Sequence, residues 1–217
     1  MSRSSLKKDV EAFLDKYFTF QRVESPKAGY LALQGDISVI DDQQKFWGKF
    51  NVLVLVNVSV YPYTIPIVIE KSEVIDRDWA FHISKDGECC LDIKHRLILR
   101  RNRGIVLKTF YKEVIYPFFA NYHFKQSTGS YANGEYEHFF LGIVQYYREE
   151  HGLEDFGHII ALLETVINGT KYEANRECPL CGGPKYKKCC RKIIYRLRPY
   201  GLDQLKEDLA FFKKNLK

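Results

Sequence analysis

The sequence lacks any uninterrupted run of roughly 18 apolar residues, the length that a helix needs to cross a bilayer. Its first residues, Met1 to Lys8, are polar and have no apolar core of the kind found in a secretory signal. Internal repeats and low-complexity tracts are also missing. These absences argue against membrane and secreted proteins, so we expect a cytoplasmic protein.

The six cysteines are unevenly placed. The first cluster is Cys89 and Cys90, and the second is Cys178, Cys181, Cys189 and Cys190, with no cysteine between them. In a reducing compartment cysteines serve as nucleophiles or metal ligands more often than as disulfides. The clustering therefore indicates two separate chemical tasks.

Hydrophobic residues make up 46% of the 217 residues, which predicts a packed core rather than disorder. The net charge of +6 is uneven. Residues 171–217 hold 13 Lys/Arg and 5 Asp/Glu, a balance of +8, whereas residues 1–170 hold 20 and 22, a balance of −2. We therefore expect residues 171–217, which we call the tail, to contact any anionic partner.

Periodicity predicts an α+β fold. Apolar residues from Leu6 to Tyr17 recur at helical spacing. Tyr30 to Ile40 has apolar residues at every second position on either side of Gly35, and Phe50 to Val60 alternates and is rich in β-branched residues, as strands are. Gly35 indicates a bulge or turn in the first strand. Ile67 to Ile69 and the region before His82 complete an expected four-stranded antiparallel meander.

Helices are expected after the first cysteine pair. The predicted ranges are 107–126, interrupted or kinked at Pro117, then 136–151, 156–167 and 203–216, with a loop over 127–135. We divide the chain into a first domain, residues 1–170, and the tail.

The first cysteine pair lies in a recognisable setting. Tyr61, Pro62 and Pro66 form a proline-rich turn, and Gly87 stands three residues before Cys90, which is followed by Leu91 and Asp92. With an N-terminal helix and a meander, these motifs resemble the ubiquitin-conjugating enzyme fold over roughly residues 6–126. The family's turn reads Tyr-Pro-x-x-Pro-Pro and its active-site run ends Gly-x-Ile-Cys-Leu-Asp. The resemblance implies that Cys90 is the nucleophile.

One departure from the family concerns the oxyanion donor. The family normally has His-Pro-Asn, with the Asn eight residues before the cysteine, and here that position is His82. The resemblance implies that His82 supports the active-site loop or donates a hydrogen bond to the oxyanion, and that Asp92 orders the loop after the nucleophile. His138 lies at the start of the helix predicted over 136–151, and a surface or capping role is the simpler interpretation of a lone histidine there.

The two adjacent cysteines are not equivalent. A Cys-Cys pair in a strand-like run also suits two small buried side chains. Strand alternation places the two on opposite faces, so only one reaches a site. Spacing from Gly87 favours Cys90 as the reactive thiol and Cys89 as the buried one.

Thiolates are strong nucleophiles and good leaving groups, which is what a thioester carrier needs. The resemblance therefore implies a conjugating enzyme that holds a partner protein's C-terminus on Cys90 and transfers it to an amine. Prokaryotic proteins that look like this one often belong to antiphage operons, where the partner is a cyclic-oligonucleotide synthase or a ubiquitin-like protein. A separate activating enzyme is one possible source of the acyl group. The alternative is an inactive binding module of the same fold.

The second cysteine cluster predicts a structural zinc site. Cys178 and Cys181 form a knuckle, Gly-Gly-Pro follows, and Cys189 and Cys190 complete a four-thiolate set that suits tetrahedral zinc. The run resembles the SEC-C motif, although that motif usually has one residue between its first two cysteines. Disulfides or free thiols are the alternative. Basic and aromatic residues around it suit nucleic acid, an acidic protein surface or only a solvated face: Lys185, Tyr186, Lys187, Lys188, Arg191, Lys192, Tyr195, Arg196 and Arg198.

Purified protein is expected to carry one zinc ion per chain. The change Cys181→Ser should release the metal and loosen the tail while the first domain stays folded, because metal binding is coupled to local folding. Inductively coupled plasma mass spectrometry measures the metal. Protein prepared without chelator that contains no zinc would contradict the four-cysteine assignment.

Overall fold

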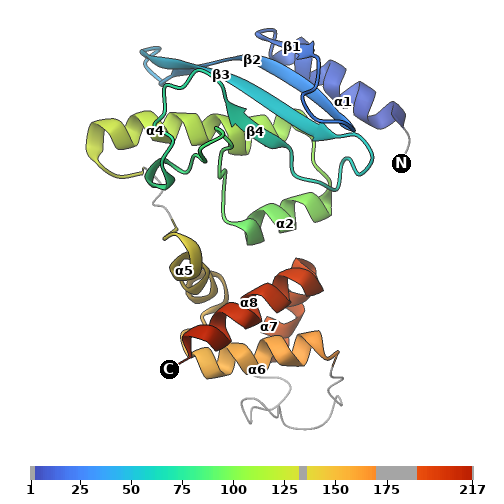
Figure 1. Ribbon diagram of the computed structural model, residues 1–217, viewed down its shortest axis with the longest axis vertical. Helices are drawn as coiled ribbons and strands as arrows, with labels where there is room; N and C mark the ends of the chain where they lie inside the picture. The colour runs from blue at the N-terminus through green and yellow to red at the C-terminus, as the bar shows by residue number, and fades with distance from the viewer. Residues whose placement is uncertain (1–2, 132–135, 170–189, 217) are drawn as a thin grey trace. The chain divides into compact units, whose positions relative to one another are not determined.

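The computed structural model describes residues 3–131, 136–169 and 190–216 (Figure 1). The chain forms two compact units, residues 1–135 and 136–217. The boundary expected at residues 170/171 thus lies inside the second unit. Among the described residues, no helix has the length and apolarity needed to cross a membrane.

The first unit contains a four-stranded antiparallel sheet, so the expected α+β class is confirmed. Its strands are β1 (Phe20–Val23), β2 (Tyr30–Ile40), β3 (Phe46–Asn57) and β4 (Ile67–Glu70). They lie in chain order, and every neighbouring pair is antiparallel. The sheet is therefore the predicted meander, with short connections between consecutive strands.

Alternation along β3 determines which side chains face the helices. Val52, Val54 and Val56 are buried in the main core, whereas Leu53 and Leu55 join a smaller cluster with Ala32 and its neighbours. Successive strand residues point to opposite faces, so these two sets lie on the two sides of the sheet.

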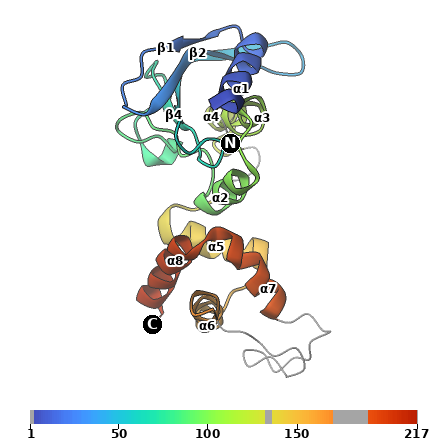
Figure 2. The same cartoon turned by 90° about the vertical axis from the view of Figure 1, so that its right-hand side faces the viewer.

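Four helical segments pack on the main-core side of the sheet: α1 (Arg3–Lys16), α3 (Leu107–Phe110), η2 (Tyr111–Ile115) and α4 (Tyr116–Thr128) (Figures 1 and 2). Pro117 lies in the first turn of α4, directly after η2, which is a π-helical turn. Proline has no N–H and its ring clashes with the preceding turn, so the α-helical ladder is interrupted where the sequence predicted.

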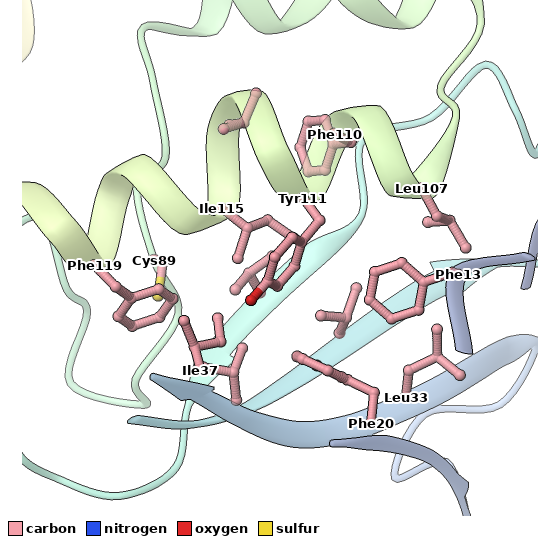
Figure 3. Close-up of a cluster of buried hydrophobic side chains, with 14 of the residues drawn as sticks. Phe13, Phe20, Leu33, Ile37, Cys89, Leu107, Phe110, Tyr111, Ile115 and Phe119 are labelled. Carbon is pink, nitrogen blue, oxygen red and sulfur yellow. The ribbon is translucent and has the colours of Figure 1, made fainter. Parts of the chain in front are cut away.

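An aromatic cluster fills the middle of this core (Figure 3). The ring of Tyr111 lies 5.8 Å from that of Phe13, 5.8 Å from that of Phe20 and 4.0 Å from that of Tyr17, measured between centroids. Tyr111 comes from η2, Phe13 and Tyr17 from α1 and the residue after its end, and Phe20 from β1. The cluster therefore joins the N-terminal helix, the edge strand and the covering helices.

Two expectations for the sheet were wrong. The region before His82 is not a strand but the 3₁₀ helix η1 (Trp79–Phe81), because the Asp78 side chain accepts a hydrogen bond from the Ala80 N–H and caps a helical turn. The fourth strand is β1 instead. Gly35 marks no bulge, since β2 runs through it. A Cβ there would lie 2.6 Å from the Phe20 Cα, so glycine permits β1 to approach.

The second unit is helical. It comprises α5 (Phe139–His151), α6 (Phe156–Ile167), α7 (Cys190–Leu197), η3 (Arg198–Tyr200) and α8 (Leu202–Asn215). Contacts join α6 to both α7 and α8. Because α6 packs on tail helices, the two helices that we expected to extend the first domain form one unit with the described part of the tail.

A polar cluster is buried in this second unit. The Tyr147 hydroxyl donates to the Asp208 carboxylate at 2.7 Å, and the Gln204 amide donates to its other oxygen at 2.8 Å. These two bonds compensate for burying the carboxylate of Asp208, which is fully inaccessible to solvent. The cluster ties α5 to α8.

Tyr61, in the predicted proline turn, connects three separate segments of the first unit. Its hydroxyl donates to the Asp9 carboxylate on α1 and lies 2.9 Å from the Ile105 carbonyl oxygen. Asp9 also accepts a hydrogen bond from the Leu107 N–H at 2.9 Å, at the start of α3. The Ile105 N–H donates to the Pro62 carbonyl at 2.8 Å. The turn is thereby fixed against α1 and α3.

Replacing Tyr61 by Phe is expected to lower the free energy of unfolding by about 1–3 kcal/mol, because Asp9 keeps only its bond from Leu107 N–H. Urea denaturation followed by circular dichroism measures the change. The control Tyr195→Phe alters an exposed ring on α7 and should be close to neutral. Equal stabilities for Tyr61→Phe and the unaltered protein would show that the network contributes nothing.

Candidate functional site

The first cysteine pair ends a tight hairpin that starts at His82. Within it, the Gly87 N–H donates to Ser84 O at 2.9 Å, and the Ser84 N–H donates to Glu88 O at 2.9 Å. The Cys90 N–H then donates to the carbonyl of His82 at 2.8 Å. The backbone of His82 therefore lies directly beside that of Cys90, as the family's spacing implied.

The returning arm of this hairpin is attached to the outer edge of β4. The Glu70 N–H donates to the Gly87 carbonyl and the Cys89 N–H donates to the Val68 carbonyl, both at 2.8 Å. This pairing continues the sheet by a short segment, so side chains alternate there as they do in a strand. Cys89 is accordingly buried in the core with Phe119 (Figure 3), and Cys90 is exposed, which confirms the predicted orientation of both.

Glycine is required at position 87. Its φ of +83° lies in the left-handed region, and a Cβ there would stand 2.6 Å from the Glu70 carbonyl oxygen. The same carbonyl accepts a hydrogen bond from the Arg77 guanidinium at 2.9 Å, and Arg77 forms an ion pair of 2.7 Å with the buried Glu70 carboxylate. An ion pair between the buried Glu70 and the partly exposed Arg77 thus holds the strand edge on which the hairpin rests.

His82 also has a left-handed backbone, with φ of +55°, and it follows η1 as its C-cap. Its ring centroid lies 5.5 Å from that of Tyr131. The Lys125 ammonium stands 4.2 Å from the Tyr131 ring centroid and donates to the Ala80 carbonyl at 2.7 Å. The end of α4 and the residues after it are therefore attached to the segment that carries His82. The sequence did not predict the contacts of Lys125 and Tyr131 with this segment, because neither residue belongs to a recognisable motif.

Asp92 lies at the junction between the cysteine and the next helix, α2 (Lys94–Arg103). Its half-buried carboxylate accepts a hydrogen bond from the Ile93 N–H at 2.8 Å. Negative charge at a helix N-terminus is favourable, so Asp92 stabilises the start of α2.

The electrostatics around the pair oppose ionisation of both thiols. Although part of Cys90 reaches solvent, the protein atoms around it remove water from its thiol, and this desolvation, followed by the charges of Asp92 and Glu88, raises the pKa of Cys90 above the ordinary value of 9.0. Burial raises the pKa of Cys89 to about 12. At neutral pH both side chains are therefore mainly protonated thiols, and Cys90 alone is reachable from solvent.

The structure does not test the zinc prediction. Cys178, Cys181 and Cys189 lie outside the described residues, and Cys190 is known only as the first residue of α7. Within the described ranges, no three His, Cys, Asp or Glu side chains form a metal-binding group. His138 is the N-cap residue of α5 in the second unit.

Helix α2 was not predicted, although it directly follows the site. Its ten residues include five Lys or Arg and no Asp or Glu. The overall charge balance of −2 over residues 1–170 gives no sign of this local excess. Two local signals were present: Arg100, Arg101 and Arg103 in the last turn and Gly104 beyond it, with φ of +87°. Basic last turns and a following glycine are typical of helix ends.

Searches against family models, curated proteins and solved structures each returned no match to this chain.

Alkylation of Cys90 by iodoacetamide is expected to be slow at pH 7 and to accelerate as the pH rises toward its raised pKa. The change Asp92→Asn removes a negative charge, lowers that pKa and should increase the rate at pH 8 by roughly severalfold. Peptide mapping by mass spectrometry separates Cys90 from the other cysteines. Asp15→Asn on α1 is the control and should leave the rate unchanged. Labelling of Cys89 as fast as Cys90 would be incompatible with the described orientation.

Proposed function

We propose that this protein is a thioester carrier of the ubiquitin-conjugating type, with Cys90 as the nucleophile. The observation that carries the proposal is the exposed Cys90 thiol at the end of a hairpin that is anchored on both sides, to His82 and to β4. The other thiol of the pair, that of Cys89, is buried and does not reach solvent. The arrangement presents one sulfur in a fixed position, as group transfer needs.

The reaction has two steps. The Cys90 thiolate attacks the activated C-terminal carbonyl of a partner, forming a carbon–sulfur bond while the activating group leaves with its electron pair. A primary amine then attacks the thioester carbonyl, an amide bond forms, and Cys90 leaves as thiolate after the amine loses a proton. The raised pKa of the free thiol favours a protonated resting state, so the first step needs loss of the thiol proton.

The first unit, in this proposal, has the fold of ubiquitin-conjugating enzymes. An N-terminal helix, a four-stranded meander, helices that cover one face and a Tyr-Pro turn before the cysteine are the features that the resemblance to ubiquitin-conjugating enzymes uses. A zinc-binding SEC-C-like appendage, held by Cys178, Cys181, Cys189 and Cys190, would accompany this domain as a structural element.

His82, Asp92 and Lys125 have supporting roles in this scheme. The carbonyl of His82 accepts a hydrogen bond from the Cys90 N–H and so orders the Cys90 backbone. The His82 side chain is the candidate donor to the oxyanion. Asp92 stabilises the start of α2 after the nucleophile. Lys125 and Tyr131 are positioning residues that hold the His82 segment against α4.

The proposed partners follow from the resemblance. The acyl donor is a protein with a free C-terminus, such as a cyclic-oligonucleotide synthase or a ubiquitin-like protein in prokaryotic antiviral defence, with a separate activating enzyme as a possible source. A cytoplasmic location suits such a role. Contact of the basic tail with nucleic acid is a separate expectation that the thioester chemistry does not require.

A synthetic peptide with a C-terminal glycine thioester is expected to acylate Cys90 and then to pass its acyl group to lysine. Intact-protein mass spectrometry measures the adduct, which a thiol reductant should cleave, as a thioester requires. Cys90→Ala should give no adduct there. Cys90→Ser should give a more durable oxyester if loading proceeds, because an alkoxide is a poorer leaving group than a thiolate.

Matched variants locate the chemistry. Cys89→Ala should keep loading and cost ~1 kcal/mol of stability at most. His82→Ala should slow transfer to lysine more than loading, if its side chain stabilises the oxyanion. If Cys89→Ala loses conjugation while Cys90→Ala keeps it, the nucleophile is Cys89 and not Cys90. If Cys90→Ala and Cys89→Ala both still conjugate, the proposal of an enzyme fails, and the alternative of a binding module with the same fold takes its place.

A further inference from the structure

Helix α7 and the turn after it carry a positive charge that the proposed thioester chemistry does not use. Residues 190–200 comprise α7 and η3 and contain four Lys or Arg residues and no Asp or Glu. They span about three helical turns, so the charge is concentrated on a short stretch of the second unit. This stretch is therefore a candidate surface for an anionic partner.

The buried and exposed residues of α7 lie on opposite sides of the helix. Ile194 and Leu197 are buried in the second unit, where α7 packs on α6 (Figure 1). Lys192, Tyr195 and Arg196 are exposed. Tyr195 and Arg196 follow Lys192 by three and four positions, the spacing at which residues share one face of a helix. The three exposed side chains therefore form a single face.

Arg198 extends this face beyond the end of α7. It is exposed, and its guanidinium carbon lies 4.9 Å from the centroid of the Tyr195 ring. We call Lys192, Tyr195, Arg196 and Arg198 the α7 face. In the part of the chain that the structure describes, none of its three cationic side chains takes part in an ion pair. The positive charge of the α7 face is therefore available to a ligand.

Helix stability alone does not account for the α7 face. Positive charge in the last turn is favourable for the helix dipole, which explains Arg196. Lys192 lies in the first turn, where the dipole disfavours a cation, and it stands four positions from Arg196, where like charges repel. The Tyr195 side chain is 65% exposed, so it contributes little to the core. An anionic ligand would offset the repulsion and use the ring.

We propose that the α7 face binds single-stranded nucleic acid, a function separate from the thioester chemistry of Cys90. The exposed Tyr195 ring offers a surface on which an unpaired base can stack. Arg198, held against that ring, adds a cation beside the stacked base. Lys192 and Arg196 lie one turn apart on the same face and neutralise phosphates of the strand.

Other anionic partners fit this surface less well. The bases of a duplex are stacked on one another and cannot cover the ring of Tyr195, so a duplex would use the cations alone. An acidic protein surface would also use the cations, but protein interfaces usually have an apolar centre. Within residues 192–200, no aliphatic side chain of Ile or Leu is exposed to form one.

The test measures binding of a fluorescein-labelled oligothymidylate to the full-length protein, prepared without chelator, by fluorescence anisotropy. We expect binding at low salt, with an affinity that falls as salt is added, because phosphate contacts release counterions. An unlabelled single strand should compete, whereas a duplex of the same length and polyglutamate should compete poorly.

Paired variants assign the binding to the α7 face. Tyr195→Ala should weaken it about tenfold, and Tyr195→Phe should retain it, because the ring is kept. Lys192→Gln with Arg196→Gln should reduce the slope of log affinity against log salt by about 1.4, the value for two phosphate contacts to a single strand. Lys206→Gln with Lys214→Gln removes the same charge from exposed positions on α8 and should leave affinity and slope unchanged.

Four results would overturn the inference. They are no binding of the single strand at low salt, equal affinity for the duplex, undiminished binding by Tyr195→Ala, and equal loss of binding in the α8 control. Competition by polyglutamate that matches the single strand, together with undiminished binding by Tyr195→Ala, would make the α7 face a site for an acidic protein. Each of these results leaves the proposed role of Cys90 unaffected, because acylation of Cys90 is measured separately.

Discussion

The hydrogen bonds between β4 and the arm from Gly87 to Cys89 are the constraint on which the candidate site depends. They extend a strand-like pattern to the cysteine pair, so one sulfur enters the core and the next faces solvent. A shift of one residue would exchange the two. The left-handed Gly87 and the Glu70–Arg77 ion pair keep this register, because both act on the same strand edge.

Features with strong local periodicity were predictable from the sequence. The alternating valines of β3 specified a strand, helix α6 has the predicted bounds, and Pro117 marked the interruption before α4. The opposite orientations of Cys89 and Cys90 followed from alternation alone. In each case the residue pattern and the packing of the core require the same structure.

Other features depended on contacts that no local pattern carries. Strand β1 has only four residues, and its exposed Gln21 and Arg22 give no alternation, so its pairing with β2 defines it. Helix α2 lacks a broad apolar face, since only His95 and Ile98 are buried. The approach of Lys125 and Tyr131 to the His82 segment joins residues more than forty positions apart. Tertiary packing decides such positions.

The protonated state of Cys90 has a consequence for its chemical durability. Peroxide oxidises thiolates far faster than thiols, and the first product, a sulfenic acid, would end any acyl-carrying role until it is reduced. Partial burial, and after it the carboxylates beside the sulfur, raise the pKa of Cys90 and keep the thiolate rare. The same surroundings that delay nucleophilic attack therefore protect an exposed cysteine during oxidative stress. Cys89 is protected as well, because burial raises its pKa to about 12 and its side chain lies in the core.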